Sequence, residues 1–142
     1  MRVFLDTNVL IDIIQEERES HEYSIAILQA VRNSPLTACV STQSIVDASY
    51  VYSQGAKAPI SEFKKAIELF GSIVDILGVE LEDIETANYG DMEDYEDAVQ
   101  LSCALRNGCD AVITNDRKFL GSSQIICYSP KDFYVYLFGT AR

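Results

Sequence analysis

Residues 2–14 read RVFLDTNVLIDII, and the interpretation of the whole chain starts from the junction inside this stretch. Arg2–Leu5 is short and rich in residues that favour β-strands, whereas the largely apolar run Val9–Ile14 is typical of a helix. The polar residues Asp6–Asn8 stand between them, and Thr and Asn commonly begin helices. The stretch therefore predicts a strand that passes directly into a helix, with a carboxylate at the carboxyl end of the strand.

The rest of the chain continues this alternation of apolar strands and amphipathic helices. Because such alternation builds parallel sheets that helices cover on both faces, the sequence predicts one domain over residues 1–142. Its expected architecture is a three-layer α/β/α sandwich around a five-stranded, mostly parallel, Rossmann-like sheet. Further strands are expected at 36–40, 73–79, 111–114 and 125–128, and further helices at 20–33, 42–55, 61–70, 82–88, 95–106 and 129–137.

The composition of the 142 residues argues against several classes of protein. With 48% hydrophobic residues and no apolar run near the roughly 18 residues that a membrane-spanning helix needs, we expect a folded chain in the cytoplasm. Four cysteines without a C-x-x-C pair and a single histidine argue against a zinc site and a disulfide framework. The net charge of −11 argues against nucleic-acid binding through a basic face, although not against binding through a metal.

Several acidic residues are expected at one edge of this sheet. Asp6 and Asp116 each follow a strand, Asp97 stands in the first turn of a helix, and Asp47 lies about two turns into another helix. Asp110 precedes its strand and is excluded, because it belongs at the opposite edge. Any one of these acids could simply cap a helix or face solvent, but their joint placement favours a shared site.

The chemistry of such a site follows from its charge. Clustered carboxylates repel one another unless a cation joins them. Oxygen ligands suit Mg²⁺ or Mn²⁺, which hold phosphate oxygens and lower the pKa of a bound water. Since the chain offers no second histidine and no obvious nucleophile, these acids favour metal-assisted hydrolysis of a phosphodiester.

Three segments carry a resemblance to a known family: VFLDTNVL at 3–10, YEDA at 95–98 and CDAVITNDRKF at 109–119. In this order and at these separations they resemble PIN-domain nucleases, the family that includes the VapC-type toxins of bacterial toxin–antitoxin pairs. The resemblance implies a catalytic set of four acids, Asp6, Asp47, Asp97 and Asp116. The metal ligands among them would be Asp6, Asp97 and Asp116.

The resemblance also assigns roles around this set. Asp47 stands where the family usually has Glu, whose side chain is one methylene longer. Asp94 and Glu96 flank the third acid without an assigned role. The residues that match supporting positions, which hold the acids through hydrogen bonds, are Asn8, Thr114 and Asn115.

By the same resemblance, the chain is expected to use Mg²⁺ or Mn²⁺, to cleave single-stranded or structured RNA, to form homodimers and to bind an antitoxin protein if it is a toxin. Three basic residues lie near the acids in sequence, namely Arg106, Arg117 and Lys118. They either guide the phosphate backbone of the RNA or are ordinary surface charges, and the sequence favours both equally.

Two other functions stay open at this point. A PIN-like module without catalysis would act only through its binding partners, and the Asp at position 47 is compatible with it. A Rossmann-like phosphatase with an aspartyl nucleophile is the weaker alternative. Such enzymes often place a second Asp two residues after the first, where this chain has Asn8. The chain has neither a Walker A loop nor a Gly-rich dinucleotide fingerprint.

Overall fold

Five parallel strands form the centre of the molecule in the computed structural model, which describes residues 1–55, 59–120 and 124–140. They lie in the order β3-β2-β1-β4-β5, so that the chain builds outward from β1 on one side and then returns to its other side. The strand order therefore reverses at β1, and sheets of this kind bind ligands beyond the carboxyl ends of the strands at such a reversal. The strands are β1 (Arg2–Leu5), β2 (Thr37–Ser41), β3 (Asp75–Leu77), β4 (Ala111–Ile113) and β5 (Ile126–Tyr128).

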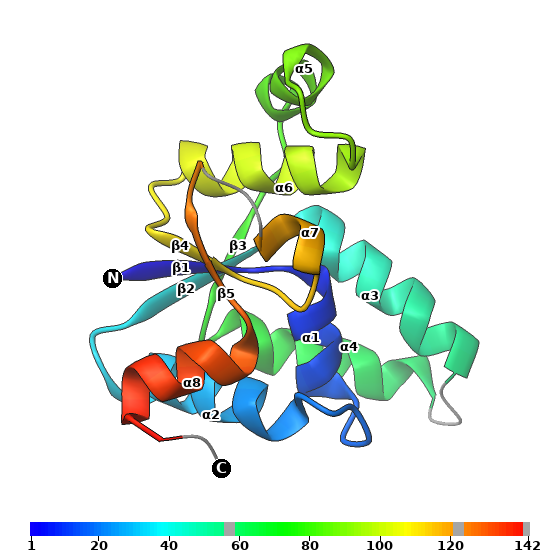
Figure 1. Ribbon diagram of the computed structural model, residues 1–142. Helices are drawn as coiled ribbons and strands as arrows, with labels where there is room; N and C mark the ends of the chain where they lie inside the picture. The colour runs from blue at the N-terminus through cyan, green and yellow to red at the C-terminus, as the bar shows by residue number, and fades with distance from the viewer. Residues whose placement is uncertain (56–58, 121–123, 141–142) are drawn as a thin grey trace.

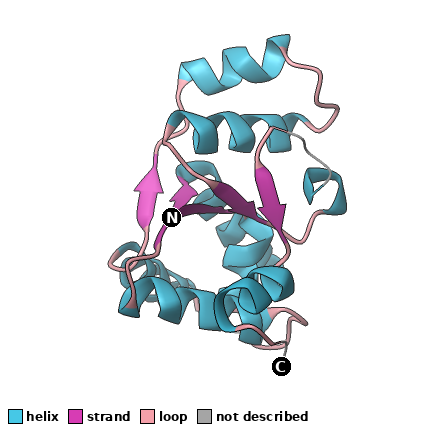
Figure 2. Ribbon diagram, turned by 60° about the vertical axis from the view of Figure 1, so that its left-hand side comes forward, coloured by secondary structure: helices cyan, strands magenta, loops and turns pink. Residues whose placement is uncertain are grey.

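Helices cover both faces of this sheet, which confirms the expected three-layer α/β/α sandwich (Figure 1). In Figure 1, α6 crosses one face with α5 outside it, while α1, α2, α4 and α8 lie on the other side. The view in Figure 2 shows the same two layers of helices with the strands between them. The helices are α1 (Thr7–Ile14), α2 (His21–Asn33), α3 (Thr42–Gly55), α4 (Ile60–Gly71), α5 (Leu81–Tyr89), α6 (Tyr95–Arg106), α7 (Arg117–Leu120) and α8 (Pro130–Phe138).

The core divides into two main clusters because successive side chains of a strand point to opposite faces. On β1, Val3 and Leu5 join the cluster beneath α1, α2, α4 and α8, which also contains Phe133. Phe4 points the other way and packs with Leu101 of α6. Since Val3, Phe4 and Leu5 are all buried, the residue that follows β1 is held firmly at the carboxyl end of the central strand.

The third strand differs from the sequence-based expectation. The third strand was expected over 73–79 but is only β3, because the backbone N–H groups of Ile73 and Val74 donate to the Phe70 carbonyl and continue the end of α4. β3 pairs only with β2, at the register Cys39–Asp75, and forms one edge of the sheet. Residues 115–119, for which the sequence favours a loop or a short helical turn, include the beginning of the short helix α7, which agrees with the helical turn.

The four cysteines are free thiols. The sequence did not indicate that Sγ of Cys39 and Sγ of Cys109 lie 3.0 Å apart, buried in the cluster beneath α6. No helix within the described ranges combines the length and the apolar character that crossing a membrane requires.

Candidate metal centre

Asp6 lies at the strand reversal, directly after β1, and is only 5% exposed. Its backbone N–H donates to the Ile113 carbonyl at 3.0 Å, which continues the pairing of β1 with β4. Its carboxylate accepts a bond from the Thr7 N–H at 2.8 Å on Oδ1. Oδ2 accepts bonds from the Thr114 hydroxyl at 2.8 Å and from Asn8 Nδ2 at 3.2 Å. Burial raises the pKa of Asp6, and the donors from Thr114 and Thr7 oppose that rise.

Three further carboxylates meet beside Asp6. Asp94, Asp97 and Asp116 each place an oxygen within 4.8 Å of the other two. Asp94 is the N-cap of α6, where its Oδ1 accepts the Asp97 N–H at 3.0 Å. Asp116 is held after β4, since its N–H donates to the Thr114 hydroxyl oxygen at 2.9 Å. The structure therefore groups Asp94 with two of the expected acids, Asp97 and Asp116, while Asp6 lies outside that group and interacts with Asp97 and Asp116 through their charges.

Asp97 is the most perturbed acid of this group. It is 6% exposed, and its Oδ2 is buried without a hydrogen-bond partner in the described part of the chain. Burial raises its pKa to about 8, helped by the neighbouring carboxyl group of Asp116 and by the charges of Asp116, Asp6 and Asp94. Without a cation, this arrangement disfavours the ionised form of Asp97.

These residues fit a hard divalent cation. The donor set consists of carboxylate oxygens, the ligands that Mg²⁺ and Mn²⁺ prefer. A buried carboxylate oxygen that lacks a partner destabilises the folded protein, and a bound ion would supply that partner. The fit thus rests on the unpaired Oδ2 of Asp97 as well as on the number of acids.

Asp47 lies to one side of this group. It is half-buried on α3, where its Oδ1 accepts a bond from Gln43 Nε2 at 2.9 Å. Burial raises the pKa of Glu96, and the charge of Asp47 is the next cause. Asp47 and Glu96 both line a cavity of about 410 Å³ that also includes Tyr95. Asp47, the fourth expected acid, therefore lies beside Glu96 and outside the group of Asp94, Asp97 and Asp116.

The three expected supporting residues form one hydrogen-bonded network around Asp6. The Thr114 hydroxyl donates to Asp6 and accepts from the Asp116 N–H, so it links two of the acids directly. The Asn115 N–H donates to Oδ1 of Asn8 at 3.0 Å, and Asn8 in turn donates to Asp6. Each of the three thus contacts an acid or a residue that contacts one.

Gln100 is a buried polar residue of the site that sequence reasoning missed. Its Nε2 donates to Ser44 Oγ at 2.6 Å and to Thr7 Oγ1 at 3.3 Å, while its Oε1 accepts the Ser41 hydroxyl at 2.6 Å. A hydrogen bond from Gln100 also lowers the pKa of Asp6. The available signal was a polar residue three positions after Asp97, within the inward stripe of α6.

The basic residues separate into two groups. Arg106 ends α6, at the opposite end of the helix from Asp97, and its Nη2 pairs with Oδ2 of the buried Asp83 at 2.9 Å. The expectation that Arg106 lies near the site is therefore corrected, because nine helical residues separate it from Asp97 by about 13 Å. Arg117 and Lys118 are exposed at the start of α7, directly after Asp116.

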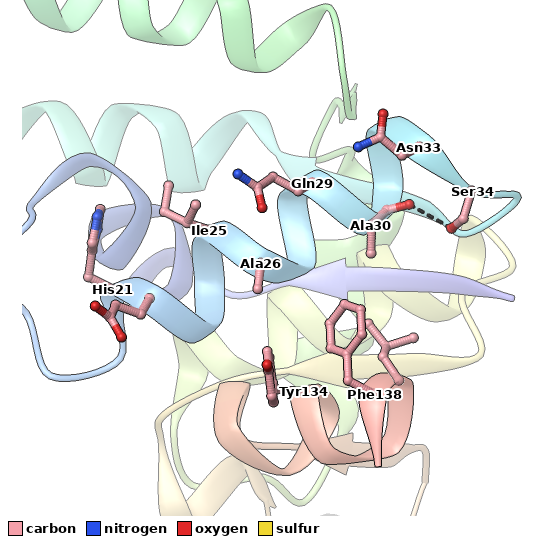
Figure 3. Close-up of a pocket in the computed structure, with 11 residues that line it drawn as sticks. His21, Ile25, Ala26, Gln29, Ala30, Asn33, Ser34, Tyr134 and Phe138 are labelled. Carbon is pink, nitrogen blue, oxygen red and sulfur yellow. Dashed lines mark hydrogen bonds between the residues drawn. The ribbon is translucent and has the colours of Figure 1, made fainter. Parts of the chain in front are cut away.

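A larger cavity lies away from the acids. It measures about 890 Å³ and lies between α2 and α8, as Figure 3 shows. Figure 3 places Ala26 and Ala30 of α2 opposite Tyr134 and Phe138 of α8. None of the acids of the metal centre lines this cavity, so it is separate from the candidate site.

Comparison with known proteins gives consistent results. A family model described as PIN domain matches residues 2–118. Ribonuclease VapC1 of Aquifex aeolicus is 29% identical over 121 residues, which cover 83% of this chain and 83% of that protein.

Solved structures agree on the fold. VapBC2 from Rickettsia felis, bound to a DNA fragment from its promoter, superposes with a TM-score of 0.66 at 16% identity and covers 91% of this chain and 98% of its own. VapC20 of Mycobacterium tuberculosis, described as a Sarcin-Ricin loop cleaving toxin, gives a TM-score of 0.66 at 12% identity over 85% of this chain and 95% of its own.

Proposed function

The chain belongs to the PIN domain family, and from this membership we propose that it is a nuclease that hydrolyses RNA with Mg²⁺ or Mn²⁺. The observation that carries the proposal is the buried, unpaired Oδ2 of Asp97 within the group of carboxylates. The name of the Aquifex aeolicus relative, a ribonuclease, supports RNA as the substrate class.

The roles of the chain's own residues follow from their positions. Asp97, Asp116 and Asp94, with Asp6 beside them, would hold the ion. When bound, a divalent ion supplies positive charge to phosphate oxygens and lowers the pKa of a bound water. Thr114 and Asn8 fix the carboxylate of Asp6, and Asp116 is fixed through its N–H.

Two further groups would act on the substrate rather than on the ion. Asp47 and Glu96 form the acidic wall of the neighbouring cavity, and the raised pKa of Glu96 favours a proton on its carboxyl group. Arg117 and Lys118 give an otherwise acidic protein local positive charge beside Asp116. They would attract the RNA backbone to the site at close range.

The direct test is a cleavage assay on an RNA oligonucleotide with Mg²⁺, Mn²⁺ or EDTA. We expect cleavage only with metal and loss of cleavage in Asp6→Asn and Asp116→Asn. Asp110→Asn is the matched control, because Asp110 lies at the other edge of the sheet and accepts the Arg2 N–H at 2.8 Å. Full cleavage in EDTA by a purified sample would refute the metal mechanism.

The partner expected for this function is an antitoxin protein. The Rickettsia felis structure is a VapBC assembly with promoter DNA, which supports the proposal that this chain is the toxin of such a pair acting in the cytoplasm. Expression alone should stop growth, and co-expression of the protein encoded by a small adjacent gene should restore it. Size-exclusion chromatography of the chain alone tests the expected homodimer.

The phosphatase alternative is weakened by the geometry of Asn8. Its Nδ2 donates to Asp6, and its Oδ1 accepts the Asn115 N–H, so this side chain is committed to hydrogen bonds and carries no acid. A chromogenic phosphomonoester distinguishes the two enzymes, because a nuclease should leave it intact. Undetectable RNA cleavage with intact partner binding would favour the module without catalysis.

A further inference from the structure

A second buried carboxylate lies close to the metal centre but outside it. Asp12 on α1 is 1% exposed. Its Oδ1 accepts a bond from Arg18 Nε at 2.8 Å, so the buried charge has a basic partner. Its Oδ2 accepts bonds from Ser24 Oγ at 3.2 Å and from Asn115 Nδ2 at 2.7 Å. Asp12 therefore touches the Asn115 part of the network without touching the acids of the site.

The contact between Asp12 and Asn115 has a fixed direction. An ionised carboxylate only accepts hydrogen bonds, so Asn115 must turn its Nδ2 rather than its Oδ1 toward Asp12. Oδ1 of Asn115 then accepts the Ser20 hydroxyl at 3.2 Å. In this orientation Nδ2 of Asn115 also reaches Oδ1 of Asn8 at 3.3 Å, beside the backbone N–H at 3.0 Å.

The orientation of the Asn115 amide also affects the hydrogen bond that Asn8 donates to Asp6. Two donors from Asn115 reach Oδ1 of Asn8, so the amide of Asn8 is oriented with Nδ2 toward Oδ2 of Asp6 at 3.2 Å. A rotated Asn8 amide would face Asn115 with a donor and Asp6 with an acceptor, and both contacts would be lost. One of the three donors to the Asp6 carboxylate, Asn8 Nδ2, thus takes part of its orientation from a carboxylate buried six residues further along the chain.

We propose that Asp12 is a positioning residue, which fixes the Asn115 and Asn8 amides and through them the carboxylate of Asp6 for metal binding. The metal in this inference comes from the proposed function, but the hydrogen bonds that join Asp12, Asn115, Asn8 and Asp6 are present without metal. Groups that orient metal ligands commonly change metal affinity by roughly 10–100-fold when they are replaced.

The chain contains a matched control for a purely structural role. Asp83 on α5 is 0% exposed and, like Asp12, accepts bonds from an arginine and a serine: Arg106 Nη2 at 2.9 Å and Ser102 Oγ at 2.8 Å. None of its hydrogen-bond partners contacts Asp6 or Asn8. Asp83→Asn therefore disturbs a similar buried group at a distance from the metal centre.

The experiment compares wild type, Asp12→Asn and Asp83→Asn with two readouts besides activity. The first is NMR hydrogen exchange of the Asn8 side-chain amide in metal-free protein, and the second is Mn²⁺ affinity by calorimetry. Both variants should melt earlier than wild type. Only Asp12→Asn should lose protection of the Asn8 amide and bind Mn²⁺ about tenfold more weakly.

Asn8 protection and Mn²⁺ affinity that are the same in Asp12→Asn and Asp83→Asn would overturn the inference. If Asp12→Asn does not fold, Asn115→Ala takes its place, because it keeps the pair of Asp12 with Arg18. Wild-type protection and affinity in Asn115→Ala would equally overturn it. Failure of the proposed function has a different signature: wild type and Asp6→Asn would show the same Mn²⁺ binding, while the metal-free exchange still decides the role of Asp12.

Discussion

Asp97 and Asp116 place carboxylate oxygens within 4.8 Å of each other, although one residue stands in the first turn of α6 and the other lies beyond the end of β4. Asp116 is among the main causes, after burial, of the raised pKa of Asp97. The two residues come from elements on different sides of the strand reversal, and the sheet holds them together despite their repulsion. The metal-free protein therefore stores unfavourable electrostatic energy that a cation would release.

The stability of the metal-free protein should fall as pH rises. The pKa of Asp97 is about 8 in the folded protein against 3.8 as the ordinary value, so the folded state holds this proton more tightly than the unfolded chain. The resulting stabilisation is complete below the unfolded pKa and is lost as pH rises through the folded one. Between them the slope approaches about 1.4 kcal/mol per pH unit for this group. Urea unfolding at pH 5, 6 and 7.5 in EDTA measures how the free energy of unfolding changes with pH. If wild type and Asp97→Asn show the same change, the prediction is contradicted.

Asp97→Asn should stabilise the metal-free protein while removing its response to metal. At pH 8 the substitution removes a repelled charge, and we expect the free energy of unfolding to rise by up to about 5 kcal/mol, the slope of about 1.4 kcal/mol per pH unit taken from 3.8 to about 8. A ligand that binds only the folded state raises its melting temperature, so wild type should gain a Mn²⁺-dependent shift that Asp97→Asn lacks. Asp110→Asn should keep the whole shift. Melting curves with EDTA and with Mn²⁺ decide the matter, and a variant that retains the wild-type shift would remove Asp97 from the ligands.

Asp47→Asn should lower the pKa of Glu96. The charge of Asp47 and its hydrogen bond with Glu96 both raise that pKa, so removing the charge leaves burial as the main cause. NMR titration of the Glu96 side-chain carboxyl measures the change. Asp132→Asn on α8 is the control, because Asp132 is exposed on the opposite face of the sheet. An unchanged Glu96 titration would show that the two side chains do not interact in solution.

Arg117→Ala combined with Lys118→Ala should weaken the salt dependence of RNA cleavage. Both side chains are exposed beside Asp116, where an RNA backbone would approach. Each phosphate contact that is lost should lower the slope of log(kcat/KM) against log[salt] by about 0.7 for a single strand. The control removes two exposed charges elsewhere, Arg32 and Lys131, and should leave the slope unchanged. Equal slopes in both double variants would mean that Arg117 and Lys118 only add surface charge.

Arg106→Ala should cost stability rather than substrate binding. The substitution leaves Asp83 buried at 0% exposure without its basic partner, and such a loss typically costs about 3–5 kcal/mol. Chemical unfolding measures the cost, and kcat and KM should equal those of wild type at a temperature where the variant is folded. A raised KM in fully folded Arg106→Ala would show that Arg106 contributes to substrate binding.

The sequence predicted those parts of the site that local order determines. Asp6 follows β1 and Asp116 follows β4, and parallel strands necessarily bring such positions to one edge. Asp94 needed the geometry of the α6 N-terminus to be placed with Asp97. Arg106 was expected near the site from its nearness in sequence, but two and a half turns of helix separate it from Asp97.

The sequence did not predict how buried polar groups outside the family motifs pair with one another. Asp12 lies in an apolar helix and resembles an ordinary surface acid until its partner Asn115, 103 residues away, is known. The contact between the Cys39 and Cys109 thiols spans 70 residues and has no motif. Local patterns identify which residues are apolar, but the pairing of buried polar groups depends on the packing of distant segments.

The pairing of β1 with β4 also determines when this site can exist during protein synthesis. Thr114 and Asp6, joined by one hydrogen bond, are 108 residues apart in the chain. At translation rates of about 5–20 residues per second, the ribosome makes β1 roughly 5 to 20 s before it makes the residues that complete the centre. A nascent chain of a ribonuclease with this topology therefore cannot cleave RNA before β4 has been made. A product that ends prematurely before β4 would be inactive rather than harmful to the cell.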